Sequence, residues 1–436
     1  MAYFIIETKE QLDKLEIGTR CFIDIISLSE DAHPSLTSPS VIYFNDFNKG
    51  YIIPINHSEG FSLDWNQVKD FIQSFLKVFV LDKKWHSYFF DKRECLIDVY
   101  HTMLDERGSI IDLDCYTNVH KDFYHKHKYV ENVNSVLPIA KHYERCECMF
   151  ESALPFIARV PDNLDWIHNY TEAYLWVEQQ GIKINEKIFD KYYEPTWKSN
   201  SIRDGKIYTK YNLFNITARP TNAYNGINFL ALPKDKSRAA FIPANDVFVE
   251  FDFDGYHLRL IANTIGFELP TNVSIHTYLG QQYFNKKELT PEEYQESKKI
   301  TFRQLYNGVE SEYRRIEFFN KVVIFIEDMW ETGQHQKYIV LPNGRYLRAV
   351  EFNPQKLFNY YVQCLETVNN VKKLLKLKEL LKDMKSRVVL VVYDSILVDF
   401  SKEDGRGVLD QIRDILQEDN YLVKGQLGKN YDFGQK

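Results

Sequence analysis

Two aspartates, each at the polar end of an apolar stretch of β type, are the residues of this sequence best suited to chemistry. In VFVEFDFDGYHLRL, strict alternation places Glu250, Asp252 and Asp254 on one face of a strand and the Val and Phe side chains on the other. Asp394 interrupts the apolar run VVLVVYDSILVDF, where a carboxylate is costly unless it is paired or binds a metal. Two carboxylates from separate strands supply the hard oxygen ligands of a two-Mg²⁺ phosphoryl-transfer site. The alternative is that both are solvated residues at strand ends.

A basic and aromatic helix face is the second candidate for chemistry. In ESKKITFRQLYNG, Lys298, Phe302 and Tyr306 recur at every fourth position, which places them on one face of a predicted helix. This face offers a cation for a triphosphate and two rings that could stack on a base or a sugar. Lys299 and Arg303 form a second basic pair on the adjacent stripe. The alternative is an ordinary amphipathic helix whose lysines are solvated.

The composition is that of a globular protein with room for two or three domains. The chain has 436 residues, of which 44% are hydrophobic and 26% are charged, so a sizeable core is expected. Lys and Arg number 54 against 61 Asp and Glu, and the formal charge of −7 excludes a nucleic-acid binder that works by bulk charge, although not one with a local basic groove. The six cysteines have no repeated spacing, and no apolar run reaches membrane-spanning length. We therefore expect a cytoplasmic protein in a reducing compartment, with no disulfide scaffold and no membrane partner.

The elements that must position these residues fall into two regions. Residues 20–60 are predicted as short strands broken by Asp, Asn, Gly and Pro, and residues 65–180 mostly as helices, among them WNQVKDFIQSFLKVF. The turn-rich segment EPTWKSNSIRDGKIYTKYN marks a domain boundary after about residue 190. Beyond it, VFVEFDFD and RVVLVVYDSILVDF are strong strand signals with long helices between them and no βαβ rhythm, which predicts an α+β fold.

Five sequence blocks, among them those that carry Asp252, Lys298 and Asp394, occur in the order found in family A DNA polymerases. The chain resembles the bacterial DNA polymerase I type of this family. TARPTNAYNGINFLALP with RAAFIP resembles the segment that leads into the palm, FDFDGYHLR motif A, KKITFRQLYNG motif B, and VYDSILVDF motif C. NGRYL and NYYVQ resemble the segment that contacts template and primer. The closing GKNYDF is similar to the family's Gly-x-Asn-aromatic end, so the resemblance covers residues 217–431.

The resemblance implies template-directed DNA synthesis, in which a primer 3′-OH attacks the α-phosphate of a deoxynucleoside triphosphate and pyrophosphate leaves. Asp252 and Asp394 would hold two Mg²⁺ ions, and Lys298 would neutralise charge on the leaving phosphates. Phe302 and Tyr306 would form the wall against base and sugar. The implied partners are primer–template DNA and deoxynucleoside triphosphates. One side chain of the protein would lie in the minor groove near the primer end. The residues implied to contact primer and template are Arg219 (the minor-groove residue), Arg259, Asn359, Gln363 and Tyr393.

Three positions depart from the family's pattern. His257 stands where motif A usually carries a Glu that helps to exclude the ribose 2′-OH, and Tyr294 stands where motif B usually carries an Arg. Motif C usually reads His-Asp-Glu, whereas this chain has Tyr-Asp-Ser around Asp394. We expect the bulk of His257 to block a 2′-OH sterically. We also hypothesise that Lys299 or Arg303 supplies the missing phosphate charge.

Residues 1–165 resemble, more distantly, the family's RNase H-like 3′–5′ exonuclease domain in a degenerate form. Asp24 is kept in FIDIIS, but Ile26 fills the place of its Glu partner. His86 ends the DKKWH block where an Asp belongs, and Glu147 replaces an Asp in YERCE. Because a two-metal nuclease needs several converging carboxylates, we expect a structural platform without proofreading.

The rest of the chain is predicted as a connecting helix with a vestigial thumb over 166–215, then a palm and fingers domain over 216–436, with the fingers at about 270–345. Too few residues precede the Thr-x-Arg segment to build a thumb of the usual length. We therefore expect weak, salt-sensitive DNA binding and a processivity protein that replaces the thumb. The compact size and the missing thumb resemble a replicase of a bacteriophage or of another mobile element.

Two other functions are open at this point. The first is a catalytically weakened, polymerase-like scaffold subunit that binds DNA in a replication complex, and the retention of Asp252, Asp394 and Lys298 argues against it. The second is a nuclease that uses the N-terminal domain, and the lost carboxylates argue against that.

Overall fold

The computed structural model describes residues 3–29, 32–107, 110, 132–193, 202–222 and 227–434. The chain forms two compact units and crosses between them more than once, first within helix α7 (Asp165–Glu178). The predicted boundaries at residues 165 and 215 separate an exonuclease-like region, a vestigial thumb, and a palm with fingers. This division stays a prediction. The first unit contains Met1–Leu175, Tyr193–Lys210 and Tyr224–Gly226, and the second contains Trp176–Tyr192, Tyr211–Ala223 and Ile227–Lys436.

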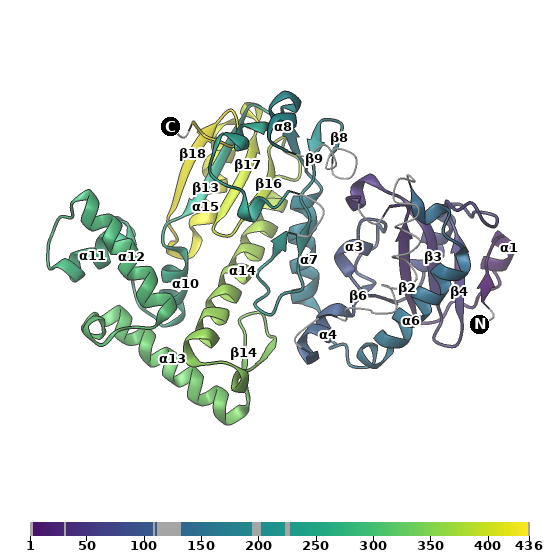
Figure 1. The fold of residues 1–436 in the computed structure, drawn as a ribbon, viewed down its shortest axis with the longest axis horizontal. Helices are drawn as coiled ribbons and strands as arrows, with labels where there is room; N and C mark the ends of the chain where they lie inside the picture. The colour runs from purple at the N-terminus through teal and green to yellow at the C-terminus, as the bar shows by residue number, and fades with distance from the viewer. Residues whose placement is uncertain are drawn as a thin grey trace. The chain divides into compact units, whose positions relative to one another are not determined.

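The first unit is built on a mixed six-stranded sheet in the order β1-β4-β3-β2-β5-β6 (Figure 1). The strands β2, β3 and β4 form an antiparallel meander, whereas β5 and β6 extend the sheet in parallel with β2. The strands predicted over residues 20–60 are thereby confirmed. The strand bounds are β1 (Phe4–Ile5), β2 (Arg20–Ser27), β3 (Pro39–Asn45), β4 (Gly50–Pro54), β5 (Lys77–Val80) and β6 (Leu96–Asp98).

Helices cover both faces of this sheet, because its central strands bury apolar side chains on both sides. Phe22 and Ile26 of β2 pack with the apolar face of α6, and Ile23 and Ile25 pack on the other face with α2. The result is a helix–sheet–helix layering, as expected for an α/β domain. The helix bounds are α1 (Lys9–Leu12), α2 (Trp65–Ile72), α3 (Lys83–His86), α4 (Tyr100–Arg107) and α6 (Ile139–Ile157).

One helix of this unit is shorter than predicted. The segment WNQVKDFIQSFLKVF is helical only over Trp65–Ile72, and its last residues belong to strand β5, Lys77–Val80. The prediction is wrong at this end because Val78 and Val80 are buried in the sheet, where parallel pairing with β2 outweighs the helical periodicity.

The second unit is centred on a fully antiparallel sheet of four strands in the order β16-β17-β13-β18. VFVEFDFD forms β13 as predicted, but RVVLVVYDSILVDF is a hairpin that turns at Asp394 rather than one strand. Helix α10 follows β13 directly and packs against α14, which packs against α15 (Figure 1). The bounds are β13 (Val247–Phe253), β16 (Arg387–Val392), β17 (Ser395–Phe400), β18 (Val423–Gly428), α10 (Tyr256–Thr264), α14 (Pro354–Leu380) and α15 (Gly405–Gln417).

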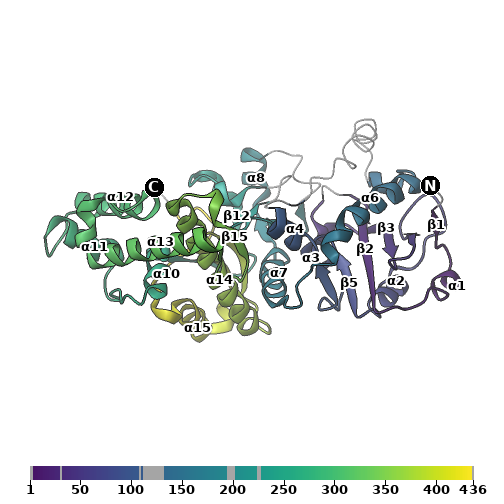
Figure 2. The same ribbon diagram turned by 90° about the horizontal axis from the view of Figure 1, so that it is seen from below.

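Three helices after α10 form a helical part of the second unit. They are α11 (Ile275–Phe284), α12 (Pro291–Asn307) and α13 (Glu317–Gln336), and α11 lies beside α12 in both views (Figures 1 and 2). Helix α12 starts at a capping box, in which Thr290 accepts from the Glu293 N–H and the Glu293 carboxylate accepts from the Thr290 N–H. It ends at Gly308, whose φ of 105° lies outside the range of other residues. The sequence therefore sets both ends of the helix that carries Lys298.

Short elements occupy the region predicted as a vestigial thumb. The described part of residues 186–216 holds the single helix α8 and strands of two residues, with no helical hairpin, and residues 194–201 lie outside the described residues. The bounds are α8 (Glu186–Tyr192), β7 (Ile182–Ile184), β8 (Ile202–Arg203), β9 (Lys206–Ile207), β10 (Tyr211–Asn212), β11 (Thr221–Asn222) and β12 (Phe241–Ile242), while β14 (Tyr338–Val340) and β15 (Tyr346–Arg348) form a hairpin after α13.

Two expectations from composition can be compared with the structure. None of the described helices is both long and apolar enough to cross a membrane. Cys21, Cys95, Cys146 and Cys364 form no disulfide, whereas Cys148 is disulfide-bonded, which the expectation of a reducing compartment did not include.

Candidate active site

Asp252 and Asp394 lie beside each other at one end of the antiparallel sheet. Strand β13 pairs with β17 so that Asp252 is opposite the residue after Asp394, and the Phe253 N–H donates to the Asp394 carbonyl over 3.1 Å. Partial burial, together with the charges of Asp394 and Glu250, raises the pKa of Asp252 to about 6. Burial and the charge of Glu366 raise the pKa of Asp394 as well. The structure thus brings together the two carboxylates that stand out in the sequence.

A tight turn holds Asp394 in place. Tyr393 and Asp394 alone join β16 to β17, and Tyr393 has a φ of 55°, in the left-handed region that bulky residues avoid. Two contacts fix Tyr393 in this conformation. The guanidinium of Arg219 lies 4.0 Å from the centre of its ring, and Asn370 donates to its carbonyl over 3.0 Å.

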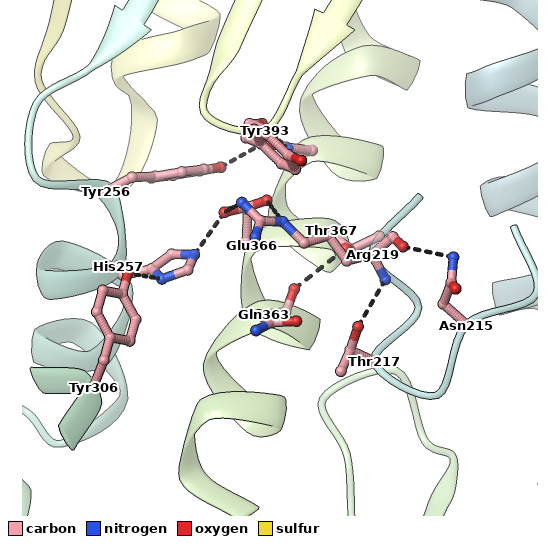
Figure 3. A network of polar contacts seen from close by, with 11 residues as sticks. Asn215, Thr217, Arg219, Tyr256, His257, Tyr306, Gln363, Glu366, Thr367 and Tyr393 are labelled. Carbon is pink, nitrogen blue, oxygen red and sulfur yellow. Dashed lines mark hydrogen bonds and ion pairs between the residues drawn. The ribbon is translucent and has the colours of Figure 1, made fainter. Parts of the chain in front are cut away.

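Four side chains from four segments form a continuous polar network along one side of the site (Figure 3). The Tyr306 hydroxyl of α12 lies 2.6 Å from His257 Nδ1 of α10, and His257 Nε2 lies 2.5 Å from Glu366 Oε2 of α14. Arg219 donates to both carboxylate oxygens of Glu366, with Nε at 2.8 Å and Nη2 at 3.2 Å. Although burial opposes ionisation, His257 and Arg219 hold the pKa of Glu366 below its ordinary value. The network locks the imidazole of His257 from both of its nitrogens.

The loop that carries Arg219 is itself held by short-range hydrogen bonds. The Arg219 N–H donates to Thr217 Oγ1 over 3.3 Å, and Asn215 donates to the Arg219 carbonyl over 2.9 Å (Figure 3). Both contacts are of the side-chain-to-backbone kind that shapes turns. They aim the guanidinium at Glu366 and Tyr393.

A second charged contact lies where β13 meets α11. Lys424 is opposite Asp252 in β18, and its ammonium donates to Asp254 Oδ1 over 2.5 Å. Asp254 also accepts from Ser274 Oγ and from the Ile275 N–H, each at 3.2 Å. Although burial opposes ionisation, Lys424 holds the pKa of Asp254 below its ordinary value. Asp254 therefore ties the sheet to the first turn of α11.

Gly255 lets the chain turn from β13 into α10. Its φ is 59°, and a Cβ at this position would lie 2.1 Å from Ile275 Cγ2. We expect Gly255→Ala to lower the free energy of unfolding by about 2 kcal/mol or more, because both the left-handed backbone and the contact with α11 are penalised. Urea denaturation measures this loss. Gly407→Ala in α15, where a Cβ would meet nothing within 4 Å, is the control and is expected to be neutral or stabilising; equal losses in both variants would contradict the account.

These groups line one pocket of about 310 Å³. Its wall from α12 carries Lys298, Phe302 and Tyr306, as the spacing predicts. The rings of Phe302 and Tyr306 are stacked, with centroids 6.1 Å apart and planes 9° apart, and Phe302 is 43% exposed. The Lys298 ammonium lies 4.8 Å from the centre of the Tyr294 ring, and in the part of the chain that the structure describes it has no carboxylate partner. The pocket thus combines a pair of carboxylates, an uncompensated cation and an open aromatic surface.

The second basic stripe of α12 does not line this pocket. Lys299 lies 3.6 Å from Glu296, and Arg303 lies 3.4 Å from Glu310, with all four side chains about half exposed or more. Helix packing decides which stripe faces the sheet, and spacing along the sequence cannot. The nucleotide contacts assigned to these two residues stay predictions.

Three residues predicted to contact primer and template also lie outside the pocket lining. Arg259 is 2% exposed and donates to the carbonyls of Asp254 and Pro270, at 3.2 Å and 3.1 Å. Asn359 donates to the Tyr306 carbonyl over 3.0 Å, and Gln363 is half-buried on α14 (Figure 3). Their nucleic-acid contacts stay predictions, whereas Arg219 and Tyr393 do line the pocket.

Among the residues of this pocket, Glu366, Lys424 and His276 were not predicted from the sequence. Glu366 and Lys424 come from segments that carry no motif, and only the folded chain brings them to the site. His276 is 4% exposed, and its Nδ1 has no hydrogen-bond partner among the described residues. Burial lowers its pKa to about 4, and Lys298 and Lys424 act in the same direction, so the ring is neutral.

Asp252 and Asp394 are the residues that could hold a metal ion. Burial and the neighbouring carboxylates raise the pKa of both aspartates, so a bound cation would stabilise their charged forms. Among the described residues, no group of three or more His, Cys, Asp and Glu has the arrangement of a metal site. The pair therefore fits a cation that takes most of its ligands from water and substrate phosphates, as Mg²⁺ does.

In the first unit, Asp24 and Glu147 lie against protein groups. Asp24 Oδ1 lies 3.5 Å from His86 Nε2, and Oδ2 lies 3.7 Å from Cys146 Sγ. Although burial opposes ionisation, His86 and Arg145 hold the pKa of Asp24 below its ordinary value. Glu147 accepts from Tyr43 over 2.5 Å. Both carboxylates thus have protein groups beside them, and the loss of proofreading stays a prediction.

Comparison with known proteins shows a similarity of fold. No family model and no curated protein matches the sequence. A solved structure is similar over 99% of this chain and 100% of its own, with a TM-score of 0.70 and 12% sequence identity: the POL domain of Pol1 from M. smegmatis in complex with DNA primer-template and dNTP. The chain therefore has the mixed α/β fold of a polymerase domain.

Proposed function

We propose that this protein is a DNA-directed DNA polymerase of family A type that adds deoxynucleotides to a primer 3′-OH and releases pyrophosphate. One observation carries the proposal. In a chain with a polymerase fold, Asp252 and Asp394 face Lys298 and two stacked rings of α12 across one pocket. The antiparallel sheet then corresponds to the palm, and α11, α12 and α13 correspond to the fingers.

The carboxylate pair fits two Mg²⁺ ions. Asp252 and Asp394 would hold them, and the repulsion between the two charges would be relieved by the ions. When bound, the ions would activate the primer 3′-OH and neutralise charge on the attacked phosphate.

The other residues of the pocket would hold the nucleotide. Lys298, which has no carboxylate partner among the described residues, would neutralise the leaving phosphates. Phe302 offers an exposed face on which a base can stack. Tyr306 and His257, joined over 2.6 Å, would stand against the sugar and leave no room for a 2′-OH.

Arg219 would contact the primer end. Its guanidinium lies over the ring of Tyr393, next to Asp394, and is held there by the two hydrogen bonds to Glu366. From there it can reach the minor groove, where readout depends on shape more than on sequence.

We also propose that the first unit is an exonuclease-like platform without proofreading, because Asp24 is paired with His86 and Cys146. The net charge of −7 supports a protein partner that helps to hold the duplex. We also propose a cytoplasmic location, which is the cytoplasm of the host if the chain is of bacteriophage type.

The test is a labelled primer on a longer template, incubated with the protein, Mg²⁺ and four deoxynucleoside triphosphates. We expect the primer to lengthen at low salt, with the template base deciding which nucleotide is added. Excess chelator is expected to stop synthesis while the protein stays folded, since two carboxylates that repel each other do not need the metal for folding. We expect no shortening when nucleotides are left out.

Other outcomes of this assay point to the other functions. Shortening of the primer would contradict the proposal and favour a nuclease. Tight binding of the primer–template with neither lengthening nor shortening would favour a catalytically weakened scaffold subunit.

A further inference from the structure

We infer that Lys424, on the last strand of the sheet, is a second phosphate-binding cation of the nucleotide pocket. This inference rests on the proposed function and adds a residue to it. From the sequence, the second cation was expected on α12, at Lys299 or Arg303, but both residues lie outside the pocket lining.

The position of Lys424 follows from strand register. Strand β18 pairs with β13 so that Lys424 is directly opposite Asp252, and directly opposed side chains lie on one face of a sheet. That face is the floor of the pocket, which Lys424 lines together with Asp252, Asp254 and Asp394. The side chain is 66% exposed, so its stem can adjust when a ligand arrives.

The hydrogen bond to Asp254 does not use up the capacity of Lys424. Asp254 already accepts from Ser274 Oγ and the Ile275 N–H, so it is satisfied without the ammonium. An ammonium has three donors, and the contact with Asp254 occupies one. Asp254 therefore holds Lys424 in the pocket lining and leaves its other donors for a ligand.

Few cations of the pocket lining are available to bind phosphates, and Lys424 is one of them. Arg219 is committed to Glu366 by two hydrogen bonds, so the cations of the pocket lining that remain for a phosphate chain are Lys298 and Lys424. Lys298 belongs to α12 and Lys424 to the sheet. The two would contact a triphosphate from different sides, and charge-assisted hydrogen bonds of this kind are the strong ones.

The test measures binding of inorganic tripolyphosphate by isothermal titration calorimetry, which needs no catalysis. Lys424→Met is expected to weaken binding about 10-fold or more, the loss typical of one hydrogen bond between charged groups. Lys424→Arg is expected to restore most of the affinity. Lys429→Met is the matched control, because Lys429 is an exposed lysine that follows β18 and contacts the Asp246 carbonyl; it should bind as the wild type does.

A fourth variant separates phosphate binding from a purely structural role. Asp254→Asn loosens the joint with α11 but keeps the ammonium, so it should retain or increase tripolyphosphate affinity. The inference is overturned if Lys424→Met binds as tightly as the wild type, if Asp254→Asn loses as much affinity as Lys424→Met, or if the wild type does not bind tripolyphosphate. Primer extension by the same proteins reports on the proposed function separately.

Discussion

Replacing Asp394 with asparagine is expected to reduce the rate of nucleotide addition by about 10³-fold or more while the fold is retained. Asparagine keeps the size of the side chain but not the charge that a pair of divalent cations requires, and removing one such electrostatic contribution typically lowers a rate by this factor. Because the pKa of Asp394 is raised, the charged carboxylate is disfavoured in the folded protein. The melting temperature of the metal-free variant should therefore be equal to that of the wild type or higher.

Single-turnover primer extension and thermal unfolding of the same preparation give the two values. Asp410→Asn is a matched control, since Asp410 is a half-exposed aspartate of α15 that contacts Arg413 over 3.3 Å and is not part of the pocket lining. It should leave the rate unchanged. A rate for Asp394→Asn within a few fold of the wild type would remove the carboxylate pair from the mechanism.

Replacing Glu366 with leucine is expected to lower the free energy of unfolding by about 3 kcal/mol, the lower end of the range for breaking a buried ion pair. Glu366 is 2% exposed and is the common acceptor for Arg219 and His257. Without it, both donors lose their partner, although Arg219 is exposed enough to recover some hydration. The variant should also lose activity, because His257 and Arg219 are no longer oriented.

The effect of Glu366 depends on pH with a defined sign. Its pKa is lowered in the folded protein, so its contribution to stability is complete above the ordinary glutamate pKa of 4.5 and is lost as the pH falls through the folded value. Urea denaturation at pH 7 and near pH 4 should therefore show a larger difference between wild type and Glu366→Leu at pH 7. Glu379→Leu, an exposed position on the same helix, should change stability by about 0.5 kcal/mol or less. Equal unfolding midpoints for wild type and Glu366→Leu at pH 7 would show that the network does not stabilise the fold.

Local pattern in the sequence was sufficient to find the carboxylate pair and the aromatic face of α12. Alternation placed Asp252 on the polar face of β13, and an Asp inside an apolar run marked Asp394. Helical spacing grouped Lys298, Phe302 and Tyr306, and all three line the pocket. These features survive folding because each depends on the period of a single element.

Features that depend on packing between distant segments could not be predicted from the sequence. Arg219 and Glu366 are 147 residues apart, and neither periodicity nor spacing indicates that they form an ion pair. The same holds for Lys424, whose position opposite Asp252 depends on the register of β18. The strand Lys77–Val80 was missed because its environment in the sheet, rather than its own pattern, decides its conformation.

The most direct test of the central claim is the location of Mn²⁺ in crystals of the protein with primer–template DNA and a non-hydrolysable deoxynucleotide. Anomalous scattering should place Mn²⁺ between the carboxylates of Asp252 and Asp394, in contact with the nucleotide phosphates, and Asp394→Asn should weaken or remove that signal. Mn²⁺ bound to the nucleotide elsewhere, with both carboxylates free of metal, would contradict the account.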